Sequence, residues 1–248
     1  MNDYTLGIEE LDNAIGGIKK GSNIMLIGPP MSGKEAILRQ IMYHGSVRKE
    51  NAIITVTTRE SGAHILDWFQ ENRLTLPLSR IGIVDCVTKK HYVKSDNENI
   101  KIAAGPADLT GIGVRISQFL EEFSTKKNIL KIQLHIDSIS TMLMYSNIRT
   151  VFKFLHVFTG RIKGSGGLGI FILESQMHEE QKIAILKHLF DYTIEIESEN
   201  DTKFLRMVGL SSKPTQYFEY ETEGAKVKIG NATYHQSKKG EAMLGRDI

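Results

Sequence analysis

Two hydrophobic periods alternate along the first 190 residues of the chain. Short, mostly apolar runs are typical of strands that are buried on both faces, and they occur at residues 24–27, 53–56, 81–87, 132–136 and 170–173. Between them, apolar residues recur every three or four positions, which predicts helices at about residues 8–15, 34–48, 65–69, 109–123, 149–162 and 179–190. Repeated strand–helix units predict an α/β fold, in which a mostly parallel sheet carries helices on both faces.

The pattern changes after about residue 190. Four short segments then alternate between apolar and polar positions, which predicts antiparallel strands at 192–197, 203–209, 216–221 and 225–229 that extend the edge of the sheet. The chain contains five prolines, and no proline-rich linker divides it. We therefore predict a single domain at residues 1–230, followed by a polar C-terminal tail at residues 231–248.

Composition excludes several classes of protein. Lys and Arg number 31 against 29 Asp and Glu, and this near-balance argues against a strongly basic nucleic-acid coat protein. The single cysteine, Cys86, cannot form an internal disulfide or a four-thiolate zinc site. No apolar run approaches the roughly 18 to 20 residues that span a bilayer, and the first residues lack the features of a signal peptide. We expect a cytoplasmic protein without membrane insertion.

A glycine-rich segment directly follows the first apolar run. Residues 28–35 read Gly-Pro-Pro-Met-Ser-Gly-Lys-Glu and contain the pattern G-x-x-x-x-G-K between a predicted strand and a predicted helix. In a phosphate-binding loop, backbone N–H groups and the helix N-terminus face the phosphates, and the lysine adds positive charge. We therefore predict that nucleotide is bound by Gly28, Pro29, Pro30, Met31, Ser32, Gly33, Lys34 and Glu35. The alternative is a glycine-rich turn that only connects a strand to a helix.

Glu35 departs from the usual form of this loop. A Ser or Thr hydroxyl at this position normally binds Mg²⁺, whereas a carboxylate adds negative charge beside a polyphosphate. At about 4 Å and an effective dielectric near 20, one such charge pair costs roughly 4 kcal/mol, which equals about three decades of affinity. Three outcomes are open: Glu35 points away, nucleotide binds weakly, or metal is held in an altered way.

An acidic residue ends the fourth predicted strand of the core. The sequence there is Leu134-His135-Ile136-Asp137-Ser138. In phosphate-loop proteins an acid at this place lies near the magnesium ion and its waters. Asp137 is therefore a candidate for nucleotide and metal binding, and Glu35 is a second candidate metal ligand. The alternative is an aspartate that ends a strand at a turn.

Further segments, in their order and spacing, resemble KaiC-like proteins of the RecA superfamily. These segments are residues 6–12 (Leu-Gly-Ile-Glu-Glu-Leu-Asp), 16–18 (Gly-Gly-Ile), 21–22 (Gly-Ser), the loop at 28–35, 136–140 (Ile-Asp-Ser-Ile-Ser) and 190–194 (Phe-Asp-Tyr-Thr-Ile). The resemblance covers about residues 5–230 and is closest to the archaeal proteins associated with regulation and motility. It implies a RecA-like P-loop NTPase core, ATP or a related nucleotide as ligand, and frequent assembly into rings or filaments.

The same resemblance identifies positions where the chain departs from active relatives. The segment after the second strand usually carries adjacent acids, one of which polarises the attacking water; here Arg59 stands at the first acid and Glu60 at the second. Arg59 stays protonated, so Glu60 is the candidate catalytic base. Glu174 and Ser175 stand where a polar residue senses the terminal phosphate in relatives. The alternative for Arg59 and Glu60 is a solvated pair in a loop. The alternative for Glu174 and Ser175 is a turn-forming role.

The remaining polar residues favour no further chemistry. The eight histidines form no ligand array, and His135 is interpreted as a packed core histidine on an apolar strand. Basic and aromatic residues lie together at 89–94, but residues 88–99 are also rich in Asp, Asn and Glu. We interpret this stretch as an exposed or partner-contacting loop, and nucleic acid is not an expected ligand.

These positions favour a RecA-like domain that binds ATP or another purine nucleotide and hydrolyses it weakly or not at all. Glu35 and Arg59 are the proposed reasons for low turnover. The expected role is in signal transduction, because nucleotide occupancy would set the conformation or assembly offered to a protein partner or to further copies of the chain. One alternative is an active ATPase that drives assembly or nucleic-acid transactions, with Glu60 as base and Glu35 as metal ligand. The other is a structural module that has lost nucleotide.

Overall fold

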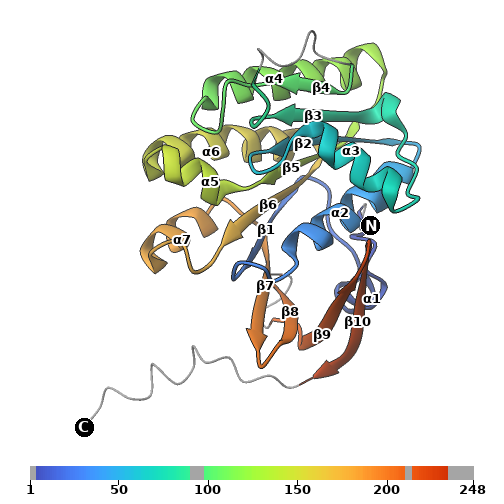
Figure 1. Cartoon of the computed structure of the whole chain (residues 1–248), viewed down its shortest axis with the longest axis vertical. Coiled ribbons are helices and arrows are strands. Elements are labelled where there is room, and N and C mark those ends of the chain that lie inside the picture. Colours follow the sequence, from blue (N-terminus) through green and yellow to red (C-terminus); the bar gives the residue numbers. More distant parts are fainter. Residues whose placement is uncertain (1–3, 90–97, 210–213, 234–248) are drawn as a thin grey trace.

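The computed structural model describes residues 4–89, 98–209 and 214–233, and one sheet runs through these residues. Its strand order is β10-β9-β8-β7-β1-β6-β5-β2-β3-β4 (Figure 1). Neighbouring strands run parallel from β7 to β4, with bounds β7 Tyr192–Glu199, β1 Ser22–Gly28, β6 Leu168–Glu174, β5 Lys131–Asp137, β2 Asn51–Thr57, β3 Ile81–Asp85 and β4 Ile100–Ile102. Three antiparallel strands extend the other end: β8 Thr202–Val208, β9 Tyr217–Glu223 and β10 Lys226–Thr233. The predicted α/β fold is confirmed.

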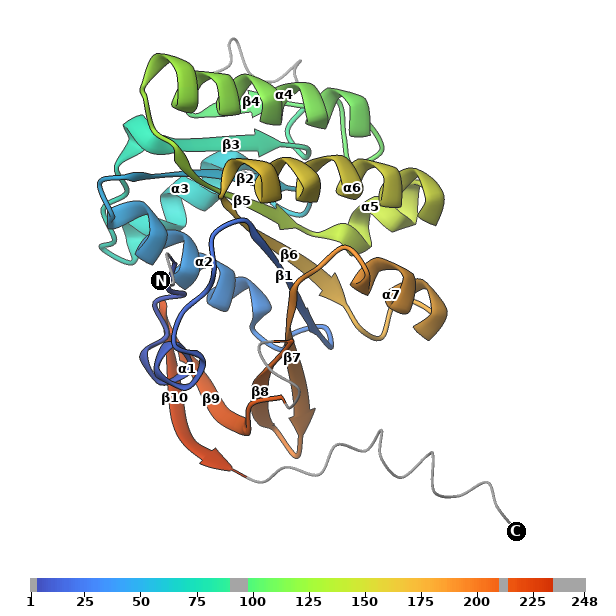
Figure 2. The ribbon, with the colours of Figure 1, turned by 180° about the vertical axis from the view of Figure 1, so that it is seen from behind.

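Helices cover both faces of the sheet. Helices α1, α2 and α3 pack on one face, and α4, α5 and α6 pack on the other (Figures 1 and 2). The bounds are α1 Glu9–Ile15, α2 Lys34–Val47, α3 Gly62–Glu71, α4 Leu109–Glu121, α5 Ile139–Tyr145, α6 Ile148–Ser165 and α7 Glu180–Lys187. This two-sided cover explains why β1, β2, β3 and β6 are buried along their whole length and read as continuous apolar runs.

The structure corrects several expectations about single elements. The segment at 192–197 was expected to be antiparallel, but β7 pairs in parallel with β1 and is antiparallel only to β8. The reason is that α7 carries the chain back across the sheet before β7, as a parallel connection requires. The strand β4 and the helix α5 were not predicted, because elements this short show no clear periodicity.

The C-terminal boundary also differs from the prediction. Strand β10 continues to Thr233, so the tail predicted from residue 231 overlaps the end of a strand. Residues 234–248 of that tail, and residues 90–97 of the loop predicted at 88–99, lie outside the described residues.

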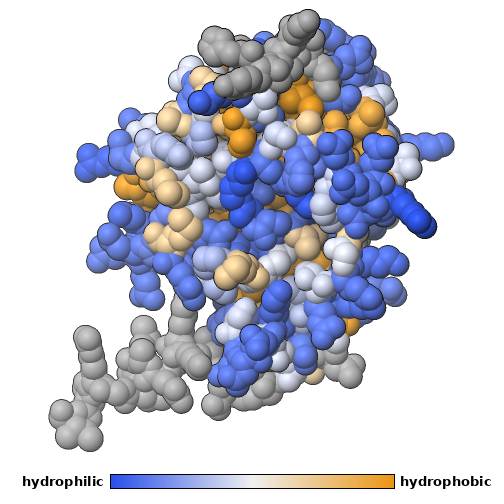
Figure 3. Space-filling model, viewed as in Figure 1, coloured by the Kyte–Doolittle hydropathy of each residue, from blue (hydrophilic) through white to orange (hydrophobic). Residues whose placement is uncertain are grey.

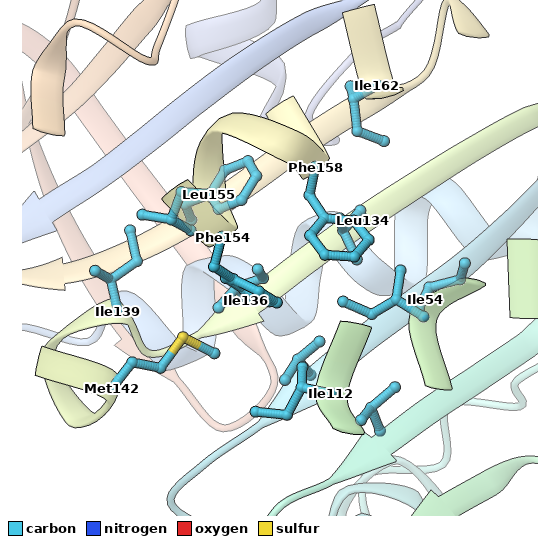
Figure 4. Close-up of a cluster of buried hydrophobic side chains, with 14 of the residues drawn as sticks. Ile54, Ile112, Leu134, Ile136, Ile139, Met142, Phe154, Leu155, Phe158 and Ile162 are labelled. Carbon is cyan, nitrogen blue, oxygen red and sulfur yellow. The ribbon is translucent and has the colours of Figure 1, made fainter. Parts of the chain in front are cut away.

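The largest hydrophobic cluster lies between the sheet and helices α4, α5 and α6. Leu134 and Ile136 of β5 lie beside Phe154, Leu155 and Phe158 of α6 (Figure 4). Each of these side chains is buried, and burial of one such side chain contributes about 1.5–3 kcal/mol. Because side chains alternate along a strand, the intervening residues of β5 face helix α2 on the other side of the sheet.

The N-terminal segment that resembles KaiC-like proteins has a structural role here. Asp12 in α1 accepts hydrogen bonds from the backbone N–H groups of Leu6 (2.7 Å), Gly7 (2.8 Å) and Ile8 (3.2 Å). Helix α1 then ends at Gly16, whose φ of 67° is one that glycine adopts without strain. Asp12 therefore ties the turn before α1 to the helix itself.

Among the described residues, no helix is long and apolar enough to cross a bilayer. The face drawn in Figure 3 is largely hydrophilic, and its hydrophobic residues occur in scattered groups.

Candidate functional site

Four parallel strands end side by side at one edge of the sheet. In the sheet register, Gly28 at the end of β1 lies opposite Glu174 at the end of β6, and Thr57 of β2 lies opposite Asp137 of β5. Strands β5 and β6 are themselves neighbours, so the four ends form a continuous row. Ligands of open α/β sheets bind beyond the carboxyl ends of the strands. The predicted site residues all follow these ends.

Residues 28–35 form a tight turn between β1 and α2. Helix α2 begins at Lys34, and Gly33 before it has a φ of 87°, which glycine tolerates. A Cβ atom on Gly28 would lie only 2.7 Å from the Cβ atom of Ile196 in β7, so this position has room for glycine alone. Strand, glycine turn and helix N-terminus therefore occur in the order that a phosphate-binding loop requires.

The side chain of Lys34 is fully buried beneath this turn. Its Nζ atom donates to the carbonyl oxygen of Pro29 (2.5 Å) and to Oγ of Ser32 (3.1 Å), and it lies 2.8 Å from Oε2 of Glu174. The ammonium of Lys34 therefore donates two hydrogen bonds within the turn, and its contact with Glu174 is an ion pair. A phosphate bound at the turn would compete with these acceptors for the same protons.

Strand β9 packs against the turn at residues 28–35. The hydroxyl of Tyr220 donates a hydrogen bond to the carbonyl oxygen of Ser32, and Tyr220 is 1% exposed. A Cβ atom on Gly33 would lie 3.1 Å from Cγ2 of Thr222 on the same strand. The phosphate loop is therefore held between the parallel sheet and the antiparallel strands.

The guanidinium of Arg59 joins three carboxylates from three different elements. Its Nη1 atom lies 2.6 Å from Oε1 of Glu35 and 3.5 Å from Oε1 of Glu174, and its Nη2 atom lies 2.5 Å from Oδ1 of Asp137. Arg59 follows β2, Glu35 lies in the first turn of α2, and the other two acids end β5 and β6. We call these four residues the arginine–carboxylate cluster. Glu35 therefore points toward this cluster.

Burial and Arg59 act in opposite directions on the two nearest acids. Burial raises the pKa of Asp137 to about 6, because the charge of Arg59 only partly offsets the loss of solvent. Burial also opposes ionisation of Glu35, but the charge and hydrogen bond of Arg59 outweigh it and lower the pKa of Glu35. The pKa values of the two acids shift in opposite directions because their burial differs: the side chain of Glu35 is 33% exposed and that of Asp137 is 10% exposed.

Glu60, the candidate catalytic base, is bound by an arginine of the neighbouring helix. Nη2 of Arg39 lies 2.6 Å and 2.7 Å from the two carboxylate oxygens of Glu60. The same guanidinium stacks over the ring of Trp68, with 4.4 Å to the ring centroid. A general base needs an oxygen within reach of the proton it takes, and Arg39 engages both oxygens of Glu60. The catalytic role of Glu60 stays a prediction.

The residues predicted to hold Mg²⁺ do not fit that ion as they are arranged. Glu35 and Asp137 come together, as the metal hypothesis requires, but Arg59 lies between them and binds an oxygen of each. In the part of the chain that the structure describes, no three His, Cys, Asp or Glu side chains form a group that could hold a metal ion. A divalent ion bound to both acids would have to displace the guanidinium.

A cavity of about 470 Å³ lies beside the phosphate loop. Pro29 of the loop and Ser175 after β6 line one part of it, and polar side chains of α7 and β7 line another. On its wall, Glu195 pairs with Lys187 (2.9 Å) and Arg206 (2.8 Å). Its volume lies within the usual range for small-molecule sites.

Sequence reasoning did not single out Arg39 or Tyr220. Arg39 lies one helical turn after Glu35, and this spacing puts both side chains on one face of α2, so the sequence did contain a signal for it. That face meets Arg59 and Glu60 after β2, which produces two crossed ion pairs. Tyr220 lies 188 positions from Ser32, and no local pattern connects the two residues.

Fold and site together define a class of protein. A parallel sheet with a glycine-rich loop between β1 and α2, and an acid at the end of β5, forms an α/β fold that is similar to that of a solved KaiC-like protein. The uncharacterized protein PH0321 from Pyrococcus horikoshii, solved in complex with an unknown peptide, matches with a TM-score of 0.68 and 18% identity over 92% of this chain and 99% of that chain. The KaiC-like protein PH0186 from Pyrococcus horikoshii OT3 matches with a TM-score of 0.65 and 14% identity over 93% and 99%.

The chain belongs to a family of unknown function, DUF7504, which it matches over residues 21–196. This range includes the phosphate loop and the whole arginine–carboxylate cluster, and it excludes β8, β9 and β10. No curated protein matches the chain. The low identities to the two solved structures establish the fold alone.

Proposed function

We propose that this protein binds ATP or a related purine nucleotide at residues 28–35 and hydrolyses it weakly or not at all. Nucleotide occupancy would set the conformation or assembly that the protein presents to a protein partner. The position of Lys34 carries this proposal, because its charge is fully buried at the start of α2 beneath a glycine-bounded turn. Glu174 compensates this buried charge in the structure, and a phosphate at the turn would be a second anion within reach of the same ammonium.

Low turnover follows from the surroundings of the loop. Arg59 stands where relatives of this fold are expected to carry an acid, and a guanidinium cannot accept a proton from water. Glu60, the remaining acid of that segment, directs both carboxylate oxygens to Arg39. The arrangement therefore supports binding better than it supports activation of water.

Glu174 offers a route from the loop to the surface. Lys34 is paired with Glu174, and if Lys34 instead bound a phosphate, Glu174 would keep only the longer contact with Arg59 beside a new negative charge. Glu174 ends β6, and Ser175 and Gln176 after it line the cavity beside α7. Movement of Glu174 would thus reach α7, and occupancy shifts a population when two conformations differ in affinity.

A polypeptide is the partner that the proposal favours. The neighbour PH0321 was solved with an unknown peptide, which makes peptide recognition a reasonable activity to test on this fold. Assembly with further copies of the chain is the second form that such a switch would take. Cross-linking with and without ATP distinguishes the two.

Isothermal titration calorimetry with ATP, with and without Mg²⁺, tests the binding step. We expect the wild type to bind and Lys34→Ala to weaken binding at least about tenfold, because the variant loses the charge at the phosphates. Lys131→Ala is the matched control, since Lys131 starts β5 at the opposite edge and its side chain is 43% exposed. That control should bind ATP like the wild type.

Two results would contradict the proposal in different ways. Absence of binding at millimolar ATP would reject nucleotide and leave a structural module. Phosphate release well above the uncatalysed rate, lost in Glu60→Gln, would identify an active ATPase with Glu60 as base. The proposal requires release at background in both the wild type and Glu60→Gln.

A further inference from the structure

Arg59 lies between two acids, Glu35 and Asp137, that the sequence predicted as metal ligands. Glu35 approaches from the phosphate loop, Asp137 from β5, and Glu174 from β6. The cluster therefore holds three carboxylates against Arg59, with Lys34 as the second cation on Glu174. Without Arg59, three negative groups would meet at the ends of the strands with only Lys34 to offset them.

The burial of the partners separates this cluster from an ordinary surface ion pair. The side chain of Glu174 is 7% exposed and that of Asp137 is 10% exposed, whereas that of Arg59 is 32% exposed. Exposed pairs contribute little to stability, but acids this deeply buried need a fixed cation.

We propose that the guanidinium of Arg59 is a built-in substitute for the divalent cation of the phosphate site, so that the site takes its nucleotide in the metal-free form. This inference rests on the proposed function for the identity of the ligand. The exclusion of metal by Arg59 does not depend on any nucleotide.

The chemistry of the guanidinium supports this role. It carries five N–H donors in a planar fork, so it binds two carboxylates and still offers N–H groups to phosphate oxygens. Its single positive charge is permanent, and it needs no free ion from solution. A divalent ion prefers carboxylate oxygens in the same place, and Glu35 and Asp137 are the oxygens it would take.

Titration with Mn²⁺ alone tests the exclusion of metal. Electron paramagnetic resonance measures free Mn²⁺, and we expect Arg59→Ala to bind the ion at least about tenfold more tightly than the wild type. At a concentration of about 100 times the dissociation constant of Arg59→Ala, Mn²⁺ should raise the melting temperature of that variant by roughly 5 °C and that of the wild type by at most about half as much.

Two variants show whether the gained site is the cluster itself. Arg59→Lys keeps a positive charge between the acids, so it should gain no Mn²⁺ site. Adding Asp137→Asn to Arg59→Ala removes one ligand and should abolish the gained binding. If Arg59→Ala does not fold, Arg59→Gln carries the same test, because its neutral amide still contacts the acids.

The inference is overturned if the wild type binds Mn²⁺ as tightly as the variant without Arg59, or if no such variant gains a site. It is also overturned if Mg²⁺ strengthens ATP binding to the wild type more than about tenfold over binding in EDTA. A wild type that excludes Mn²⁺ and binds no ATP would reject the proposed function, yet it would support the substitution of the metal by Arg59.

Discussion

Lys34 and Glu35 are neighbours in sequence and yet have different surroundings in the structure. Lys34 is buried under the loop against Glu174, whereas Glu35 turns outward to Arg59. The negative charge that Glu35 adds to the loop is thus compensated by the positive charge of Arg59, 24 positions away. Glu35 and Arg59 each depart from the residue expected at their position, and in the structure the two form an ion pair.

Glu60 shows the same dependence on a partner. From the sequence it is the last acid available as a base, but the structure gives it a bidentate contact with Arg39. Arg39 in turn stacks on Trp68, so the pair connects α2 to α3. The contacts of Arg39 with Glu60 and Trp68 indicate a role in packing α2 against α3.

His135 permits a prediction for the pH dependence of stability. Its side chain is fully buried on β5, and burial lowers its pKa from 6.5 to about 3. The unfolded chain therefore binds a proton below about pH 6.5 that the folded chain refuses until about pH 3. The free energy of unfolding should fall by up to about 1.4 kcal/mol per pH unit as pH drops through this window.

Denaturant titrations at several pH values measure this slope. His135→Gln cannot titrate, so its stability should depend less on pH between 6.5 and 4 than that of the wild type. His188→Gln, at an exposed position, is the control and should keep the wild-type slope. Asp137 acts with the opposite sign, because its raised pKa adds a proton to the folded state as pH falls below about 6. Equal slopes for His135→Gln and the wild type would contradict the prediction.

At the scale of elements, hydrophobic period located most strands and helices. Strands β1, β2, β5 and β6 and helices α2, α4 and α6 lie where the sequence predicted them, because each shows a complete apolar run or stripe. The prediction that β7 is antiparallel was wrong for its pairing with β1, because strand direction depends on where the chain re-enters the sheet. The contact between β9 and the loop at residues 28–35 could not be predicted either, because it also depends on where the chain re-enters the sheet.

Tyr220→Phe tests whether β9 holds the phosphate loop in place. Removal of the hydroxyl leaves the carbonyl oxygen of Ser32 without this donor and should reduce the free energy of unfolding by about 1–2 kcal/mol. Hydrogen exchange should become faster at the amides of residues 31–34, because local opening of the loop becomes easier. Pro29 and Pro30 carry no N–H and report nothing.

Tyr217→Phe is the matched control on the same strand. Its hydroxyl donates to Glu197 at 2.7 Å, so this variant also loses a hydrogen bond of β9. It should destabilise the protein without changing exchange at residues 31–34. Equal exchange in both variants would show that Tyr220 does not hold the loop.

The whole molecule is organised around one continuous sheet. The parallel strands and the antiparallel strands share β7, and the cluster of buried residues below β1 includes side chains from α1, α2, β8 and β9. Helices α1 and α2 and strands β8 and β9 therefore share one core, and we expect the two parts of the sheet to unfold together.

Trp68 provides a measurement of this cooperativity. It is the single tryptophan of the chain and lies on α3. This helix packs near β2 and β3, at the other end of the strand order from β8, β9 and β10. Its fluorescence and the far-UV circular dichroism of the whole sheet should change at the same urea concentration. Separate midpoints would show that the antiparallel strands form an independent unit.

The sequence alone determined the alternation of strands and helices, the glycine-rich loop at residues 28–35 and the acid at the end of β5. These features are local, since periodicity and motif spacing are properties of neighbouring residues. Only the tertiary structure decided that Arg59 joins Glu35 to Asp137, that Arg39 engages Glu60, and that Tyr220 covers the loop. Charges pair with the opposite charge nearest in space, and the fold brings together residues that the sequence separates.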